Sequence, residues 1–186
     1  MTVNKTGGPG PAKGASPAKG AKAASAKKKG GKKARKKKKG KLKCGDSGKY
    51  GDLQKKYADG KERDHVPSCA ALLKNAKDNV CVGQKLCPSQ EGAIRRAAEA
   101  CAISKGIHAK YSKTFRGRNT KSQVKSDANN KKKAANRDTD AIKKGLKKSG
   151  ASKECKKKYA AWAEKVNNRT QKWYENMITK AINKGT

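Results

Sequence analysis

The two histidines of this chain, His65 and His108, are its best candidates for acid–base chemistry. His65 directly follows Asp64 and precedes Val66 and Pro67. A histidine beside a carboxylate can act as a general base, or the pair can hold a metal ion. The alternative is that each histidine makes only a structural hydrogen bond.

The residues around His65 predict how the chain positions it. Pro67 biases Val66 towards an extended conformation, and Ser68 is a typical N-cap for a helix over residues 69–76. We therefore expect a strand or loop that ends at His65, followed at once by a helix. The backbone N–H groups at such a helix start favour anions.

The segment that follows His108 is polar and basic. It contains Lys113, Arg116 and Arg118, followed by Asn119. Arginine and lysine side chains of this kind suit contacts with phosphate groups. The alternative is a basic loop that is simply solvated. Because both histidines stand in glycine-bordered polar segments, we expect both to lie in loops next to helix starts, where functional residues are common.

The charge of the chain points to a polyanionic partner. The sequence has 186 residues, with 50 Lys and Arg against 14 Asp and Glu, for a formal charge of +36. Such a field concentrates polyanions, so nucleic acid is the first partner to expect and an anionic membrane the second. No apolar run approaches the roughly 20 residues that span a bilayer, and we expect no secretory signal peptide.

Residues 1–43 form a low-complexity basic segment that holds 16 of the basic residues and none of the acidic ones. Too little apolar surface is present to offset the entropy of ordering, so we expect this tail or linker to be disordered. It resembles the Lys/Ala/Pro-rich tails of linker histones. Within it, we expect Lys36, Lys37, Lys38 and Lys39 to bind nucleic acid.

Residues 44–186 are expected to form one mainly helical domain, with a short two-stranded element near the histidines. Periodic apolar residues predict helices over 89–102, 121–148 and 153–183, and a short strand over 103–107. Thr120 and Gln123 match a capping box. The last helix has the best apolar stripe, and we expect its tryptophans, Trp162 and Trp173, to be core or partner-helix residues.

The six cysteines permit up to three disulfides, because their number is even. Their spacing does not suit a zinc site, since no Cys-x-x-Cys pair occurs. Cys101 stands among alanines and is expected to be a small core residue.

Two resemblances extend these expectations. The run Asp64-His65-Val66-Pro67 resembles the first motif of His-Me finger (HNH) nucleases, although the order His, His, Asn here differs from the family order His, Asn, His. Over residues 50–140 the chain looks like a C-terminal toxin domain of bacterial polymorphic toxin systems. That resemblance rests on a few short segments: Tyr50-Gly51-Asp52-Leu53, the run 62–72 around His65, His108, Ser112-Lys113-Thr114-Phe115, Gly117-Arg118-Asn119-Thr120, Asp127 and Arg137-Asp138.

These resemblances imply a metal-dependent nuclease that hydrolyses phosphodiester bonds. His65 would be the general base, and Asn119 would position a histidine or the phosphate. Asp64 and His108 would bind or orient a divalent metal, Mg, Mn or Zn. The substrate would be DNA rather than RNA. The domain would be secreted or delivered into a target cell without a signal peptide, act in the cytoplasm, and be neutralised by an acidic immunity protein.

Three alternatives stay open at this point. The chain could be a non-enzymatic, histone-like protein that condenses nucleic acid through its tail. It could be an interaction module that uses the face from Tyr159 to Met177. Cys69 near His65 could also form a Cys–His hydrolase.

Overall fold

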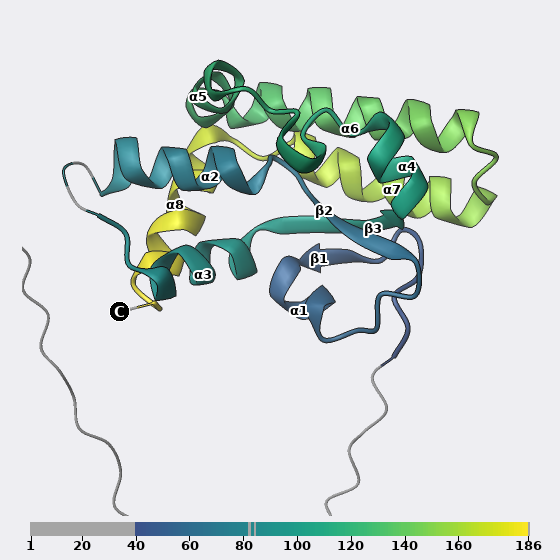
Figure 1. Cartoon of the computed structure of the whole chain (residues 1–186), viewed down its shortest axis with the longest axis horizontal. Helices are drawn as coiled ribbons and strands as arrows, with labels where there is room; N and C mark the ends of the chain where they lie inside the picture. The colour runs from purple at the N-terminus through teal and green to yellow at the C-terminus, as the bar shows by residue number, and fades with distance from the viewer. Residues whose placement is uncertain (1–39, 82, 84, 186) are drawn as a thin grey trace, which may run out of the picture. The chain divides into compact units, whose positions relative to one another are not determined.

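The fold is mainly helical, as expected from the sequence. The computed structural model describes residues 40–81, 83 and 85–185. Within these residues, eight α-helices surround one small antiparallel sheet (Figure 1). Most of the expected basic tail, with Lys36 to Lys39, lies outside the described residues. Gly40 to Lys43 are described, and Leu42 is buried beside Leu53.

The sheet has three strands rather than the expected two, in the order β1-β3-β2. The strands are β1 (Ser47–Lys49), β2 (Lys61–His65) and β3 (Glu99–Ser104). The four middle residues of the central strand, β3, are buried, from Ala100 to Ile103. Ala100 and Ala102 face the core that contains Leu42 and Leu53, whereas Cys101 and Ile103 face the helices. Cys101 is therefore a core residue, as predicted.

The helices have the following bounds: α1 (Tyr50–Gln54), α2 (Cys69–Asn75), α3 (Pro88–Ala97), α4 (Lys105–Tyr111), α5 (Lys121–Asn129), α6 (Lys131–Lys148), α7 (Lys153–Asn167) and α8 (Gln171–Ile182). A π-helical turn (Ala76–Val80) extends α2, and a 3-10 turn (Phe115–Gly117) precedes α5. Ser68 caps α2 and Thr120 caps α5, each through its hydroxyl, as the sequence predicted.

Two of the elements predicted near the histidines differ in the structure. The helix predicted over 89–102 ends at Ala97, because Ala98 is extended and residues 99–104 form β3. The strand predicted over 103–107 is instead the end of β3 and the start of α4, which Ser104 caps. Alanine favours helices in isolation, but small residues also fit a central strand that is covered on both faces.

The two long helices predicted near the C-terminus are each divided. Asn130 separates α5 from α6 and caps α6 with its side chain. Residues 168–170 separate α7 from α8, and Thr170 caps α8. A polar side chain that satisfies free backbone N–H groups makes such a restart favourable. The apolar stripe continued through both breaks, so the pattern alone did not reveal them.

The helices pack in two main cores, and the first of them includes residues of the sheet. In the first, α6 and α7 run side by side over β3 (Figure 1), and Tyr159, Trp162 and Ile142 pack against Ile103. In the second, α2, α3 and α8 pack together around Tyr174. Trp162 is a core residue as expected, whereas Trp173 is only half-buried. The expected interaction face of the last helix is thus divided between two cores.

A disulfide joins Cys44, just before β1, to Cys155 in α7. The cysteine count permits up to three disulfides, and the structure contains this one. Cys69, Cys81, Cys87 and Cys101 are free thiols. None of the helices in the described part of the chain is both long and apolar enough to cross a bilayer.

Candidate active site

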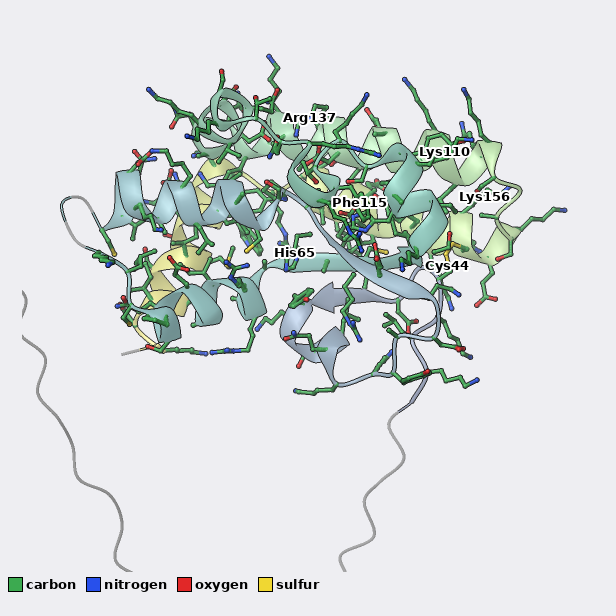
Figure 2. All side chains as sticks on the ribbon, viewed as in Figure 1. Cys44, His65, Lys110, Phe115, Arg137 and Lys156 are labelled. Atoms are coloured by element: carbon green, nitrogen blue, oxygen red, sulfur yellow. A yellow bond between two sulfur atoms is a disulfide. The ribbon has the colours of Figure 1, made fainter. Side chains whose placement is uncertain are left out.

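A pocket of about 400 Å³ gathers five of the seven predicted site residues that the structure describes. Asp64 and His65 come from the end of β2, His108 comes from α4, and Arg116 and Asn119 come from the loop before α5. Figure 2 shows the labelled His65 and Phe115 in the middle of the molecule, where these elements meet. The other lining residues are Glu62, Arg63, Ser68, Cys69, Ala70, Thr114, Phe115 and Gly117.

His108 is held between two carboxylates and lies in a helix, not in the expected loop. Its Nδ1 lies 2.6 Å from Glu62 Oε2, and its Nε2 lies 2.9 Å from Asp64 Oδ1. Burial alone would lower the pKa of His108. The hydrogen bonds and charges of Asp64 and Glu62 outweigh that effect and raise the pKa. These carboxylates favour the protonated form of the ring, in which both nitrogens can donate hydrogen bonds.

His65 has the opposite environment. It is the last residue of β2, its ring stacks on Tyr50 with centroids 4.0 Å apart, and its buried Nε2 has no hydrogen-bond partner. Burial lowers the pKa of His65, and the opposing influence of Asp64 is smaller. A neutral imidazole with one unpartnered ring nitrogen has the form that a general base requires, and water would reach this buried nitrogen only if the surrounding side chains move.

Asp64 and His65 do not act as a bonded pair, although they are adjacent in sequence. Successive residues of a strand point to opposite faces. Asp64 is almost completely buried and bonds to His108, and no bond joins it to the ring of His65. Asp64, which we expected to be the partner of His65, is thus the partner of His108.

Asn119 is held by a network that starts at the N-cap of α2. Its amide Nδ2 donates to Ser68 Oγ at 3.1 Å and to Asp127 Oδ2 at 3.5 Å. The guanidinium of Arg137 binds both oxygens of Asp127, at 2.7 and 2.9 Å, and also donates to Asp138. One arginine on α6 therefore fixes α5 and, through Asn119, the start of α2.

The loop at the rim of the pocket carries a stacked group of arginines. Phe115 meets the ring of His108 edge-on, with centroids 4.9 Å apart. The guanidinium groups of Arg116 and Arg118 lie 5.2 and 5.6 Å from the centre of the Phe115 ring. Arg116 also has a left-handed backbone, with φ of 43°, a conformation that is uncommon outside glycine and clusters at functional sites. Arg118 donates to the Ser112 carbonyl, and Lys113 is exposed outside the pocket.

Asp138 is a buried acid behind the site. Burial raises its pKa to about 7, against the opposing pull of Arg137. Between about pH 4 and pH 7, Asp138 is therefore protonated in the folded protein but ionised in the unfolded chain. The protonated carboxyl group favours folding at low pH, and this contribution to the free energy of unfolding is lost as the pH rises to 7.

Replacing Asp138 with asparagine should remove that pH dependence. We expect the free energy of unfolding of Asp138→Asn, relative to the unmodified protein, to rise by about 2 kcal/mol between about pH 5 and about pH 7.5. Urea denaturation at both pH values measures the difference. If the free energy of unfolding differs between the two proteins by the same amount at both pH values, Asp138 does not titrate in this range.

Several members of the site had no clear signal in the sequence. Glu62 was part of the run that resembled a toxin domain, but nothing identified it as a partner of His108. Arg95, near the end of α3, lies close enough to His65 to influence its pKa. Such contacts join residues far apart in the chain, so a single sequence does not reveal them. Cys69 lines the pocket, but burial raises the pKa of its thiol, which disfavours a nucleophile.

The side chains do not form a ready metal site. In the described residues, no three His, Cys, Asp or Glu side chains are grouped so that they could hold a metal ion. Both ring nitrogens of His108 are occupied by carboxylates, and the facing oxygen of Asp64 is bonded to that ring. This donor set does not fit the expected Asp64–His108 metal site, so we derive no step through a metal.

The fold and the pocket thus define a helical domain with two histidines whose pKa values are shifted in opposite directions. Over 99 residues the chain is 40% identical to a protein named deoxyribonuclease CdiA, from Dickeya dadantii (strain 3937). The matched region is 52% of this chain but 3% of that protein. This chain therefore spans a small part of its relative. No protein-family model and no solved structure matches the chain.

Proposed function

We propose that this chain is a nuclease toxin domain that hydrolyses phosphodiester bonds in DNA, with His65 as the general base. The similarity to a deoxyribonuclease supports this substrate, as does the formal charge of +36. The observation that carries the proposal is the pair of histidines that line one pocket: the pKa of His65 is lowered and its buried Nε2 has no hydrogen-bond partner, whereas the pKa of His108 is raised by two carboxylates. Acid and base roles follow from such opposite environments.

In the proposed reaction, His65 Nε2 takes a proton from a water molecule as the water oxygen attacks phosphorus. The bond from phosphorus to the leaving oxygen breaks as the new bond forms, and the leaving oxygen needs a proton. His108 can supply one from Nδ1 if the substrate takes the place of Glu62. That carboxylate is the more exposed partner, at 28% against 4% for the side chain of Asp64. Asp64 would keep the ring in place.

The remaining residues of the pocket would bind and orient the phosphate. Arg116, at the rim, would balance the charge that develops on the phosphate oxygens. Asn119 is fixed by Ser68 and Asp127, so its position is set before the substrate arrives. Arg118 and Lys113 would contact phosphates outside the pocket.

The proposal is tested by incubating the full chain with supercoiled plasmid DNA. We expect nicked and then linear products. Parallel reactions with EDTA and with added Mg²⁺, Mn²⁺ or Zn²⁺ decide whether the predicted metal is needed. A structured RNA serves as the control for substrate choice. No DNA product under any of these conditions would refute the proposal, and cleavage of RNA alone would refute DNA as the substrate.

Delivery into a target cell and an acidic immunity protein also belong to this proposal. A nuclease that acts on DNA endangers the cell that makes it, and a strongly cationic domain suits an acidic inhibitor. Co-expression with the product of the adjacent gene tests the second point, since rescue of growth is expected from an immunity protein.

A further inference from the structure

A basic groove runs along α4 and α6, outside the candidate active site. It consists of two hollows of about 450 and 480 Å³. Both are lined by Lys110, Tyr111 and Lys148, so they adjoin along these side chains. None of these three residues lines the catalytic pocket. Figure 2 shows the labelled Lys110 beside α4, on the side of the molecule where Cys44 lies.

The floor of this groove is built by a close contact. Tyr111 at the end of α4 lies against Gly145 of α6, where an added Cβ would come within 2.5 Å of the tyrosine ring. Any residue larger than glycine at position 145 would clash with the ring of Tyr111. The ring is therefore sunk between the two helices, and the lysines around it form the walls.

The walls carry positive charge that the protein does not neutralise. Lys113 and Lys144 line one hollow and Lys61 the other, in addition to the shared Lys110 and Lys148. The one carboxylate that lines either hollow is Asp140, which pairs with Lys143 at 3.5 Å. In the described part of the chain, no carboxylate lies within ion-pair distance of Lys144 or Lys148.

The groove and the catalytic pocket are linked through neighbouring residues of the chain and through Arg137. Lys113 of the groove directly precedes Thr114 of the pocket. Arg137 lines the groove and holds the Asp127–Asn119 network of the site. A chain of phosphates that leaves the pocket beside Thr114 would therefore reach Lys113 of the groove.

We propose that this groove binds the phosphate backbone of the DNA on one side of the cleaved bond. This inference rests on the proposed function and adds a binding surface to it. Lysine ammonium groups act as flexible point charges, so they contact phosphates without reading bases. The groove would therefore supply affinity that is independent of sequence and steeply dependent on salt.

A second pair of lysines provides a matched control. Lys144 and Lys148 are exposed, four residues apart and at the end of α6. Lys180 and Lys184 are also exposed and four residues apart, with Lys180 in the last turn of α8 and Lys184 just beyond it. They line a different hollow together with Trp173 and Met177. Replacing either pair with glutamine removes the same charge from exposed lysines that are four residues apart.

The experiment measures binding by the full chain carrying His65→Gln, so that DNA is not consumed. A short fluorescein-labelled duplex is titrated by anisotropy at several concentrations of KCl. For Lys144→Gln with Lys148→Gln, we expect the slope of log affinity against log salt to fall in magnitude by about 1.8, since each phosphate contact contributes about 0.9. The Lys180→Gln, Lys184→Gln control should change the slope by less than half as much. The basic tail is common to both variants, so its contribution cancels.

Equal slopes for the two variants would contradict the proposal that the groove binds DNA, because net charge alone would then explain the binding. Cleavage by the otherwise unmodified chain separates this inference from the function. If DNA is cleaved and the two pairs behave alike, only the groove is wrong. If no DNA is cleaved but the first pair alone lowers the slope, the groove stands as a DNA-binding surface and the nuclease proposal fails.

Discussion

Replacing His65 with glutamine is expected to lower the rate of DNA cleavage by about 100- to 10,000-fold, the usual contribution of a positioned general base. His65 Nε2 is buried without a partner, and burial lowers the pKa of the ring. It is thus neutral at physiological pH and free to accept a proton. Glutamine has a similar length but cannot act as a base.

The control for this prediction is the fold itself. His65 stacks on Tyr50 and ends β2, so the variant must be shown to fold by circular dichroism and thermal unfolding. Tyr50→Leu is a matched variant that removes the stacking partner and leaves the base in place, and we expect it to retain far more activity than His65→Gln. A folded His65→Gln protein that cleaves within about threefold of the unmodified rate would contradict the base assignment.

Replacing Arg137 with glutamine is expected to destabilise the protein by about 3 kcal/mol. Arg137 binds both oxygens of Asp127 and one oxygen of Asp138, and both acids are almost completely buried. Removing the cation leaves carboxylates in the interior without their partner, which typically costs about 3–5 kcal/mol. The lower end applies because the Arg137 side chain is 30% exposed.

Urea denaturation of the two proteins measures this loss. Lys147→Gln is a suitable control, because Lys147 is exposed on the same helix and makes no ion pair with a described residue. We expect that change to stay within about 0.5 kcal/mol. Arg137→Lys should fall between the two, since lysine keeps the charge but cannot bind Asp127 with two parallel hydrogen bonds. If Arg137→Gln and Lys147→Gln are equally stable, Arg137 does not stabilise the protein through its bonds to the buried acids.

Much of the fold could be predicted where the signal is local. Ser68 and Thr120 start helices as their positions indicate, because N-capping depends on a residue and the three that follow. The strand β3 could not be predicted, because its alanines adopt an extended conformation only where β1 and β2 pair with them on both sides. The ends of α5 and α7 were missed because the apolar pattern continues across both breaks.

The same distinction applies to the site. His65, His108, Asp64, Arg116 and Asn119 were named from the sequence, and the fold brings all five to one pocket. Their roles remain predictions. The pairing of His108 with Glu62 joins residues 46 positions apart, and α4 rather than a loop carries the histidine. Such pairings depend on how β2, β3 and α4 meet, which no short motif encodes.

The most direct test of the account is the cleavage rate of DNA as a function of pH, measured for the unmodified protein and for His65→Gln. The unmodified protein should lose activity at low pH as His65 becomes protonated, and lose it again at high pH as His108 gives up its proton, because the pKa of the first is lowered and that of the second is raised. The residual activity of His65→Gln should lack the low-pH decline. An identical low-pH decline in both proteins would contradict the assignment of His65 as the base.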